Sequence, residues 1–345
     1  MPIRLLLRRA ALAAVAVCLL LAANPSQAGD IGGPLVRMLT PDVPRAIGTT
    51  WVVSTREAPQ LDGCSNCRAT FLNRDPVADC YRAPLARAQV FRRERCGQLT
   101  RCRLDDLKAA LDPSRPTVIF IHGSFVSFDF FVAQSPQSQR YFERGAGRPL
   151  NVIFFTWPGD GCVPTCAAAV RIRERRARTN AFYLAELLRC TETPGCGQPT
   201  LLVSHSHGGE MVAATLHLIA GGRVAGRRLA YRPATRPRSL LFAPAMDSND
   251  LNPGQAFDCA LRATPAMAVV YSRKDVATSL YPLRRLGSPW ALGHIGLTDR
   301  NVARIGPVAR RVHNLNVTPI IGHRHQWGEY LTHPEIIAAL RSYFR

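Results

Sequence analysis

The strongest constraint on the fold is a series of continuous apolar runs that recur along the chain from residue 116 onward. The runs lie at residues 117–121, 151–156, 200–203, 238–243 and 267–272. Such runs, rich in Val, Ile, Leu and Phe, are typical of strands buried on both faces. Helical patterns lie between or after them, at 167–188, 210–220 and 334–344. This alternation predicts an α/β fold, with a mostly parallel sheet and helices on both faces, and it puts ligand sites at the carboxyl ends of the strands.

Residues 29–112 have a different pattern, with Pro-bearing turns and few apolar runs. One strand is expected at 50–54 and a short helix at 104–111. A segment of this kind cannot build a large core alone, so it needs disulfides or packing against its neighbour. We therefore expect a cysteine-rich N-terminal segment at 29–112 and the α/β domain at 113–345.

Residues 1–28 have the features of an export signal. Three arginines, at positions 4, 8 and 9, precede a 14-residue apolar run at 10–23. The run is shorter than the roughly 20 residues of a membrane-spanning helix. Small residues at Ser26 and Ala28 fit cleavage after Ala28. We expect a periplasmic or secreted protein; an uncleaved amphipathic anchor is the alternative.

The cysteine content agrees with export. Ten of the 11 cysteines follow the predicted leader, an even number that suits disulfide pairing in an oxidising compartment. Cys162 with Cys166, and Cys190 with Cys196, are natural local bridges, although spacing alone does not fix connectivity. The Cys64–Cys67 pair lacks a second pair at zinc-finger spacing, so a structural zinc site is the weaker interpretation.

The positive charge is unusual in kind. The formal net charge is +20, and all but two of the 44 basic residues are arginine. Nucleic-acid-binding proteins usually mix both cations and interleave aromatic residues, so we expect no nucleic-acid partner. The charge is compatible with weak association with an anionic membrane surface.

The most informative stretch for chemistry reads SHSHGG at residues 204–209. A buried strand runs into Ser206, and a helix begins after two glycines, which is the context of a nucleophile elbow. The usual motif is G-x-S-x-G, and Ser204 stands where glycine is usual. A polar N-cap on an ordinary strand-to-helix turn is the alternative interpretation.

Four segments together resemble the α/β-hydrolase superfamily, in particular a bacterial branch of uncharacterised serine hydrolases. They are the elbow, the IHGSFVSF loop at 121–128, the FFTWPG segment at 154–159 and the LFAPAMD run at 241–247. The resemblance covers residues 113–345 and does not extend to 29–112. It implies an α/β-hydrolase fold and a triad in the chain order Ser, Asp or Glu, His.

The resemblance places the acid after a late strand. Asp275 directly follows the strand expected at 267–272, and Asp247, after the preceding strand, is the alternative. The base is expected in the loop before the last helix, where we favour His325 over His323. These two histidines also form an H-x-H pair, but no carboxylate or cysteine partner stands near them in the sequence. We therefore expect no metal and no cofactor.

An oxyanion hole needs two backbone N–H groups. The resemblance implies one from His207, after the nucleophile, and one from Ser124 or Phe125, after His122-Gly123. Aromatic residues near the expected strand ends line an acyl pocket or belong to the core: Phe125, Phe128, Phe130, Phe131 and Trp290. The segment 283–312, between acid and base, resembles the region where this superfamily inserts a lid.

The sequence therefore predicts an exported serine hydrolase that cleaves a small-molecule or lipid carboxylic ester through an acyl-enzyme on Ser206. A non-catalytic envelope protein on the same fold is the second interpretation, because a fold does not imply activity. A metal-binding protein that uses the cysteine and histidine clusters is the third.

Overall fold

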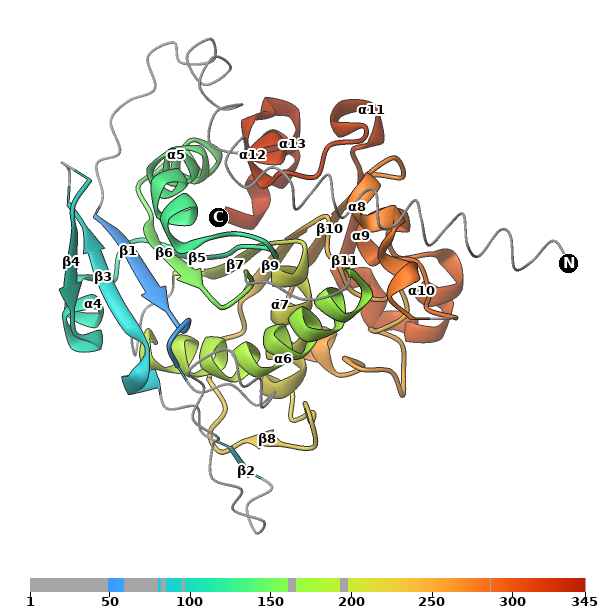
Figure 1. Cartoon of the computed structure of the whole chain (residues 1–345), viewed down its shortest axis with the longest axis horizontal. Helices are drawn as coiled ribbons and strands as arrows, with labels where there is room; N and C mark the ends of the chain where they lie inside the picture. Colours follow the sequence, from blue (N-terminus) through green and yellow to red (C-terminus); the bar gives the residue numbers. More distant parts are fainter. Residues whose placement is uncertain are drawn as a thin grey trace, which may run out of the picture.

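The computed structural model describes residues 49–58, 80–81, 85–94, 97–160, 166–192, 198–285 and 287–344. Its central feature is a nine-stranded sheet in the order β11-β10-β9-β7-β5-β6-β1-β3-β4 (Figure 1). These strands are β1 (Thr50–Ser54), β3 (Gln89–Arg93), β4 (Leu99–Cys102), β5 (Thr117–Ile121), β6 (Asn151–Thr156), β7 (Thr200–His205), β9 (Arg238–Phe242), β10 (Met267–Tyr271) and β11 (Val312–Asn316). The short strands β2 (Cys80–Tyr81) and β8 (Arg228–Leu229) pair separately.

The predicted α/β architecture with a mostly parallel sheet is confirmed. All neighbours from β1 through β6, β5, β7, β9 and β10 to β11 are parallel. Only the β1–β3 and β3–β4 pairs are antiparallel in this sheet. The central strands are buried along almost their whole length, as their continuous apolar runs predicted.

The N-terminal segment contributes to this same sheet. Strand β1 pairs in parallel with β6 on one side and antiparallel with β3 on the other. Trp51, Val52 and Val53 of β1 are buried. In the described residues, β1 therefore joins β6, β3 joins β1 and β4 joins β3, so these strands extend the main sheet across position 112/113 instead of building a core of their own.

Helices cover both faces of the sheet (Figure 1). The longer helices are α4 (Leu104–Ala110), α5 (Phe128–Ala146), α6 (Cys166–Cys190), α7 (His207–Ile219), α10 (Asp299–Ile305), α12 (Trp327–Thr332) and α13 (Pro334–Leu340). Single turns are α8 (Val276–Ser279), α9 (Leu292–Ile295) and α11 (Thr318–Ile321). Short 3-10 helices are η1 (Leu85–Arg87), η2 (Ala260–Arg262), η3 (Tyr281–Arg284), η4 (Gly306–Arg311) and η5 (Arg341–Phe344).

The alternation of side chains along each strand divides the core into two layers. In β5, Ile119 and Ile121 pack with α6 and α7, whereas Val118 and Phe120 pack with α5, α12 and α13. Figure 1 shows α5, α12 and α13 on one side of the sheet and α6 and α7 on the other. The predicted lid region forms α9, α10 and η4 between β10 and β11.

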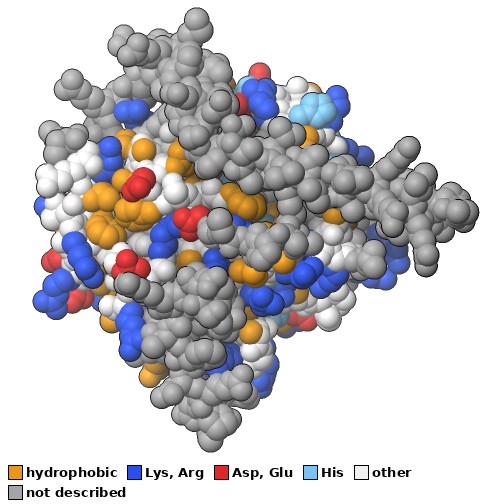
Figure 2. Space-filling view, in the orientation of Figure 1, with side chains coloured by type: hydrophobic (Ala, Val, Ile, Leu, Met, Phe, Trp, Pro, Cys, Tyr) orange, Lys and Arg blue, Asp and Glu red, His pale blue; other side chains and the backbone are white. Residues whose placement is uncertain are grey.

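Several expectations concern residues outside this description. The leader at 1–28 is one, and Cys162 and Cys196, needed for the two local bridges, also lie outside it. Cys102 and Cys259 carry free thiols. Within the described ranges, no helix has the length and apolarity to cross a membrane. On the face drawn in Figure 2, Lys and Arg side chains are spread among acidic ones instead of forming one continuous patch.

Candidate functional site

The structure gives Ser206 the backbone of a strained elbow. Strand β7 ends at His205, α7 begins at His207, and Ser206 between them has φ 54° and ψ −126°. A non-glycine residue in this region is strained, and such strain is concentrated at functional sites. Phe125 and Ala243, after the adjacent strands β5 and β9, also have positive φ, at 62° and 44°. Strain therefore gathers at the carboxyl ends of three neighbouring strands.

Glycines make this turn possible. A Cβ on Gly208 would lie 2.7 Å from the carbonyl oxygens of Ile121 and His122, and a Cβ on Gly123 would lie 2.7 Å from the Ser206 Cβ. Both distances are shorter than van der Waals contact, so the elbow and the β5 loop approach each other only without these side chains. Ser204, where the motif usually has glycine, is fully buried and fits.

Backbone hydrogen bonds fix Ser206 between two strands. Its N–H donates to the Phe242 carbonyl oxygen over 3.0 Å, and its own carbonyl accepts from Gly209 and Ala245. The residue is only 6% exposed. The serine therefore has a fixed position at the amino end of α7, where the helix dipole favours negative charge.

Asp275 and His325 are brought together. Asp275 is fully buried and caps α8: one carboxylate oxygen accepts from the Thr278 N–H over 3.1 Å. Its other oxygen, Oδ2, lies 2.7 Å from His325 Nδ1. Because a carboxylate only accepts, the His325 proton lies on Nδ1, and Nε2 is left to accept one. Ser206 Oγ and the His325 ring are not hydrogen-bonded to each other here, although the two residues are linked through His205.

The alternative acid and base have other partners. His323 is exposed, and its Nδ1 lies 3.1 Å from the carbonyl oxygen of Lys274. Asp247 is buried and forms ion pairs with Arg284 and Arg285, at 2.7 and 3.0 Å. Neither residue joins the Asp275–His325 pair.

The loop after β5 approaches the first residue of α7. Ser124 Oγ is hydrogen-bonded to His207 Nδ1 at 2.9 Å, which joins two of the three residues expected at the oxyanion hole. The third, Phe125, donates its backbone N–H to the Gly159 carbonyl oxygen over 2.9 Å. The N–H groups of His207 and Ser124 have no hydrogen-bond acceptor among the described residues. These two are therefore available to a ligand.

Arg56 holds this loop from β1, and sequence reasoning did not find it. Its guanidinium donates to Thr156 Oγ1, to the Val126 carbonyl oxygen and to Asp160. Burial lowers the pKa of Arg56, while Asp160 opposes that shift. The only available signal was its position two residues after the predicted strand 50–54. Its partners lie 70 to 104 residues away in the chain.

His122 also stabilises this loop through hydrogen bonds. Its Nδ1 donates to the Gly123 carbonyl oxygen at 2.6 Å, and its Nε2 accepts from Thr156 Oγ1 and the Trp157 N–H. The ring stacks on Trp157. Burial lowers the pKa of His122 well below its usual value, so the ring stays neutral. The HG and WPG segments noted in the sequence are thus parts of one hydrogen-bonded unit.

A buried charged network lies beside α7. Glu174 accepts from Tyr281 and Arg284, and Arg284 also pairs with Asp247. Nearby, Glu210 in the first turn of α7 accepts from Arg178 Nε over 2.7 Å. Burial raises the pKa of Glu210 to about 8, and burial together with Asp247 raises that of Asp250 to about 7. Burial lowers the pKa of His207 to about 3, so this residue is neutral beside Ser206.

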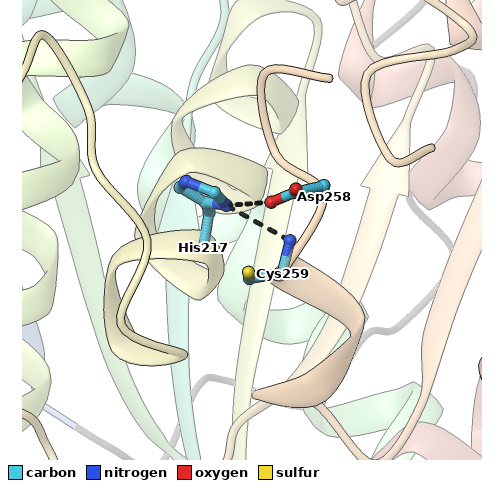
Figure 3. Close-up of side chains that lie close together, drawn as sticks. All are labelled: His217, Asp258 and Cys259. Carbon is cyan, nitrogen blue, oxygen red and sulfur yellow. Dashed lines mark hydrogen bonds and ion pairs between the residues drawn. The ribbon is translucent and has the colours of Figure 1, made fainter. Parts of the chain in front are cut away.

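Three side chains near the other end of α7 carry metal-ligating atoms. The ligand atoms of His217, Asp258 and Cys259 lie within 4.8 Å of one another (Figure 3). However, His217 Nε2 accepts the Arg223 N–H at 3.1 Å, and its Nδ1 lies 3.3 Å from the Cys259 backbone nitrogen and 3.4 Å from an Asp258 carboxylate oxygen. Both ring nitrogens of His217 therefore already face groups of the protein. This arrangement is a hydrogen-bonded cluster, and it fits a metal poorly.

The aromatic residues expected at the site divide into two groups. Phe131 is buried in the layer with α5 and Trp327, and Phe128 and Phe130 pack against the same layer. In contrast, Phe125 is 63% exposed and Trp290 is 49% exposed. Arg173 packs over the Phe125 ring, 3.9 Å from its centroid. Of these five aromatic residues, only Phe125 and Trp290 are exposed.

Comparisons with known proteins find distant structural likenesses only. No protein-family model and no curated protein matches the chain. One similar solved structure is esterase B from Lactobacillus rhamnosis inhibited by a tributyrin phosphonate, with 12% identity, 94% of each chain covered and a TM-score of 0.43. A hyperthermophilic esterase from Pyrobaculum calidifontis has 12% identity, covers 74% of this chain and 77% of its own, and has a TM-score of 0.35. With TM-scores this low, the function has to be argued from the site itself.

Proposed function

We propose that this protein is a serine hydrolase with an α/β-hydrolase fold, which cleaves a carboxylic ester through an acyl-enzyme on Ser206. One observation carries the proposal: the 2.7 Å hydrogen bond between buried Asp275 and His325, next to a strained serine in a strand-to-helix elbow. A serine hydroxyl becomes a nucleophile when a base removes its proton and an acid orients that base. These three side chains have the residue types, the chain order and the Asp–His contact that this chemistry needs.

In the first half-reaction, Ser206 Oγ attacks the ester carbonyl carbon while His325 Nε2 takes the hydroxyl proton. The imidazolium that forms carries a proton on each nitrogen, and Asp275 stabilises its charge through Nδ1. Asp275 retains its negative charge throughout. The Ser206–His325 contact closes when substrate binds, because catalytic hydrogen bonds are often long without substrate.

The carbonyl oxygen becomes negative in the tetrahedral intermediate. We assign its two donors to the backbone N–H groups of His207 and Ser124, because neither group has an acceptor among the described residues. Phe125, the other residue considered for this role, is the weaker candidate because its N–H already donates to Gly159. Preorganised donors of this kind stabilise the transition state by about 2.7–4 kcal/mol each.

The intermediate then collapses. The C–O bond to the leaving group breaks, and His325 Nε2 returns its proton to the departing alcohol. Water attacks the acyl-enzyme next, with His325 again as the base, and the acid product leaves Ser206 free. Every proton in this cycle moves through one nitrogen, so no cofactor is required.

The proposed substrate is a small-molecule or lipid ester, and the proposed location is the periplasm or the extracellular medium. The leader sequence and the cysteine content support the location. The exposed side chains of Phe125 and Trp290 support an apolar acyl group. Weak association with an anionic membrane surface remains part of the proposal, on the net charge of +20.

Turnover of a short-chain aryl ester tests the proposal. Ser206→Ala is expected to lower kcat by roughly 10⁶-fold, as loss of a triad nucleophile does. The control is Ser342→Ala, which changes an exposed serine near the carboxyl terminus. The proposal fails if Ser206→Ala retains activity within about tenfold of the unmodified protein. It also fails if the unmodified protein turns over no ester. In either case a non-catalytic role on the same fold replaces it.

A further inference from the structure

His205, the last residue of β7, faces the layer of α5, α12 and α13. Side chains alternate along a strand, and in β7 Leu201 and Val203 pack in this layer while Leu202 packs in the opposite one. His205 follows the same alternation: its ring lies 6.0 Å from Trp327 and 6.4 Å from Tyr330, between centroids. The residue directly before the proposed nucleophile therefore points toward the segment that carries the proposed base.

The ring of His205 binds the backbone of His325. Its Nε2 lies 2.5 Å from the His325 carbonyl oxygen, and the two ring centroids are 4.6 Å apart. A carbonyl oxygen only accepts, so His205 Nε2 carries a proton and donates it. Burial lowers the pKa of His205 well below its usual value, and the nearby His325 acts in the same direction. The ring is therefore a neutral donor, and its Nδ1 has no hydrogen-bond partner within the described structure.

The neighbours of His325 in its loop have their own anchors: the Val276 N–H donates to the His323 carbonyl oxygen over 3.4 Å, and His323 Nδ1 lies 3.1 Å from the Lys274 carbonyl oxygen. Ser272 Oγ donates to the Gly322 carbonyl oxygen over 2.7 Å at the start of the loop, and α12 begins at Trp327 at its end. Between these points, His205 is the only described residue that hydrogen-bonds to the His325 backbone. The Asp275 carboxylate fixes the His325 ring, whereas His205 holds the His325 backbone itself.

We propose that His205 is a positioning residue that fixes the His325 backbone relative to Ser206. The inference rests on the proposed function, because it matters only if His325 is the base for Ser206. His205 and Ser206 are adjacent in the chain, so the rigid elbow that holds the nucleophile also holds the loop of the base. A misplacement of about 1 Å between reacting groups costs about 10²-fold in rate. His205 is only 5% exposed, so we expect it to act on the rate of the chemical step and not on substrate binding.

Three substitutions separate this role from simple packing. His205→Gln keeps a donor at the reach of Nε2, His205→Asn keeps polarity but is too short for the His325 carbonyl, and His205→Leu keeps bulk without any donor. We expect Asn and Leu to lower kcat for an aryl ester by about 10²-fold, with KM changed by less than about twofold. The kcat of His205→Gln should be at least about tenfold higher than that of the Asn and Leu variants. Thermal unfolding of each variant shows whether it is folded. If His205→Leu does not fold, the comparison is made with His205→Asn.

The outcomes distinguish this inference from the proposed function. If the unmodified protein turns over no ester, or Ser206→Ala remains active, the proposed function has failed before any His205 variant is measured. If Ser206 is essential but folded Asn and Leu variants keep kcat within about threefold of the unmodified protein, His205 does not position the base. The inference is also overturned if Gln loses as much kcat as Leu, or if the substitutions raise KM and leave kcat unchanged.

Discussion

His323 and His325 lie two positions apart in the chain but have different surroundings. The conformation of their loop determines which of them reaches the Asp275 carboxylate. Gly322 has φ 61°, which turns the chain just before them. His323 then lies against the Lys274 carbonyl oxygen at the surface, while His325 reaches the buried Asp275 carboxylate. Sequence reasoning favoured His325 over His323 as the base. It did not separate them by geometry, because packing of this loop against α8 and β7 fixes its path.

The two histidine variants should therefore differ in activity. We expect His325→Ala to lower kcat about as much as Ser206→Ala, because members of a triad act as a unit. His323→Ala loses only a hydrogen bond to a carbonyl at the surface, so its kcat should stay within about tenfold of the unmodified protein. Steady-state turnover of an aryl ester, measured for both variants, checks this.

The reverse order of activities would move the base to His323 and leave the mechanism unchanged. Full activity of both variants would exclude a histidine of this loop as the base, and with it the Ser–His–Asp assignment.

At the scale of elements, α7 combines the proposed nucleophile with a buried acid. Its first turn carries Glu210, whose Oε2 has no hydrogen-bond partner within the described structure and whose pKa burial raises to about 8. An ordinary glutamate loses its proton near 4.5 when the chain is unfolded. Between these two values the unfolded chain releases a proton that the folded protein keeps. The free energy of unfolding should therefore fall as pH rises from about 5 to about 8.

Glu210→Gln should reduce this loss of stability. Each carboxyl that stays protonated only in the folded state contributes a slope of up to about 1.4 kcal/mol per pH unit. Asp250, with its pKa raised to about 7, contributes in the same direction, so the slope should shrink in the single variant and shrink further in Glu210→Gln/Asp250→Asn. Denaturant unfolding at several pH values measures it, with the exposed Glu335→Gln as the matched control.

An unchanged slope in both Glu210 variants would mean that the Arg178 ion pair outweighs burial and that Glu210 is already ionised in the folded protein. The structure contains both the burial that raises the pKa of Glu210 and the Arg178 ion pair that lowers it. Whether the slope of the free energy of unfolding against pH shrinks or stays unchanged decides which of them dominates.

The elements themselves were predictable to different degrees. The strands at 50–54, 117–121 and 151–156 have the predicted bounds, because each is buried along almost its whole length and is therefore built from an apolar run. Helix α5 was not predicted; it has Pro136 in its interior, a residue that usually breaks helices. Strand β11 was missed because it is an edge strand with His313 and Asn314 exposed. Where one side of a strand or helix contacts water, its sequence no longer has the continuous apolar run by which the buried strands were predicted.

At the scale of the whole molecule, the described strands of the N-terminal segment belong to the same sheet as the strands after residue 113. Strand β1 lies between β6 and β3, and Arg56 after it holds the loop of the proposed oxyanion hole. The sequence could indicate a strand at 50–54 but not its neighbours, since pairing over about 100 residues leaves no local pattern. The same reason hid the His205–His325 contact, which spans 120 residues.

Removal of the N-terminal strands should therefore prevent folding. A chain that starts at residue 113 loses the buried side chains of Trp51, Val52 and Val53, each worth about 1.5–3 kcal/mol. It also turns β6 into an unpaired edge. A chain that starts at residue 29, after the predicted cleavage point, is the control. Soluble yield and cooperative thermal unfolding compare the two; a shortened chain that melts like the control would show that residues 113–345 fold alone.

The most direct test of the account is the site of reaction with a fluorophosphonate, which forms a covalent bond to an activated serine. We expect one adduct per chain, located on Ser206 by mass spectrometry of the digested protein. Labelling should be absent in Ser206→Ala and strongly slowed in His325→Ala and Asp275→Asn, all confirmed as folded by thermal unfolding. An adduct on a different serine, or no adduct on a folded unmodified protein, would contradict the claim that Ser206, His325 and Asp275 form a catalytic unit.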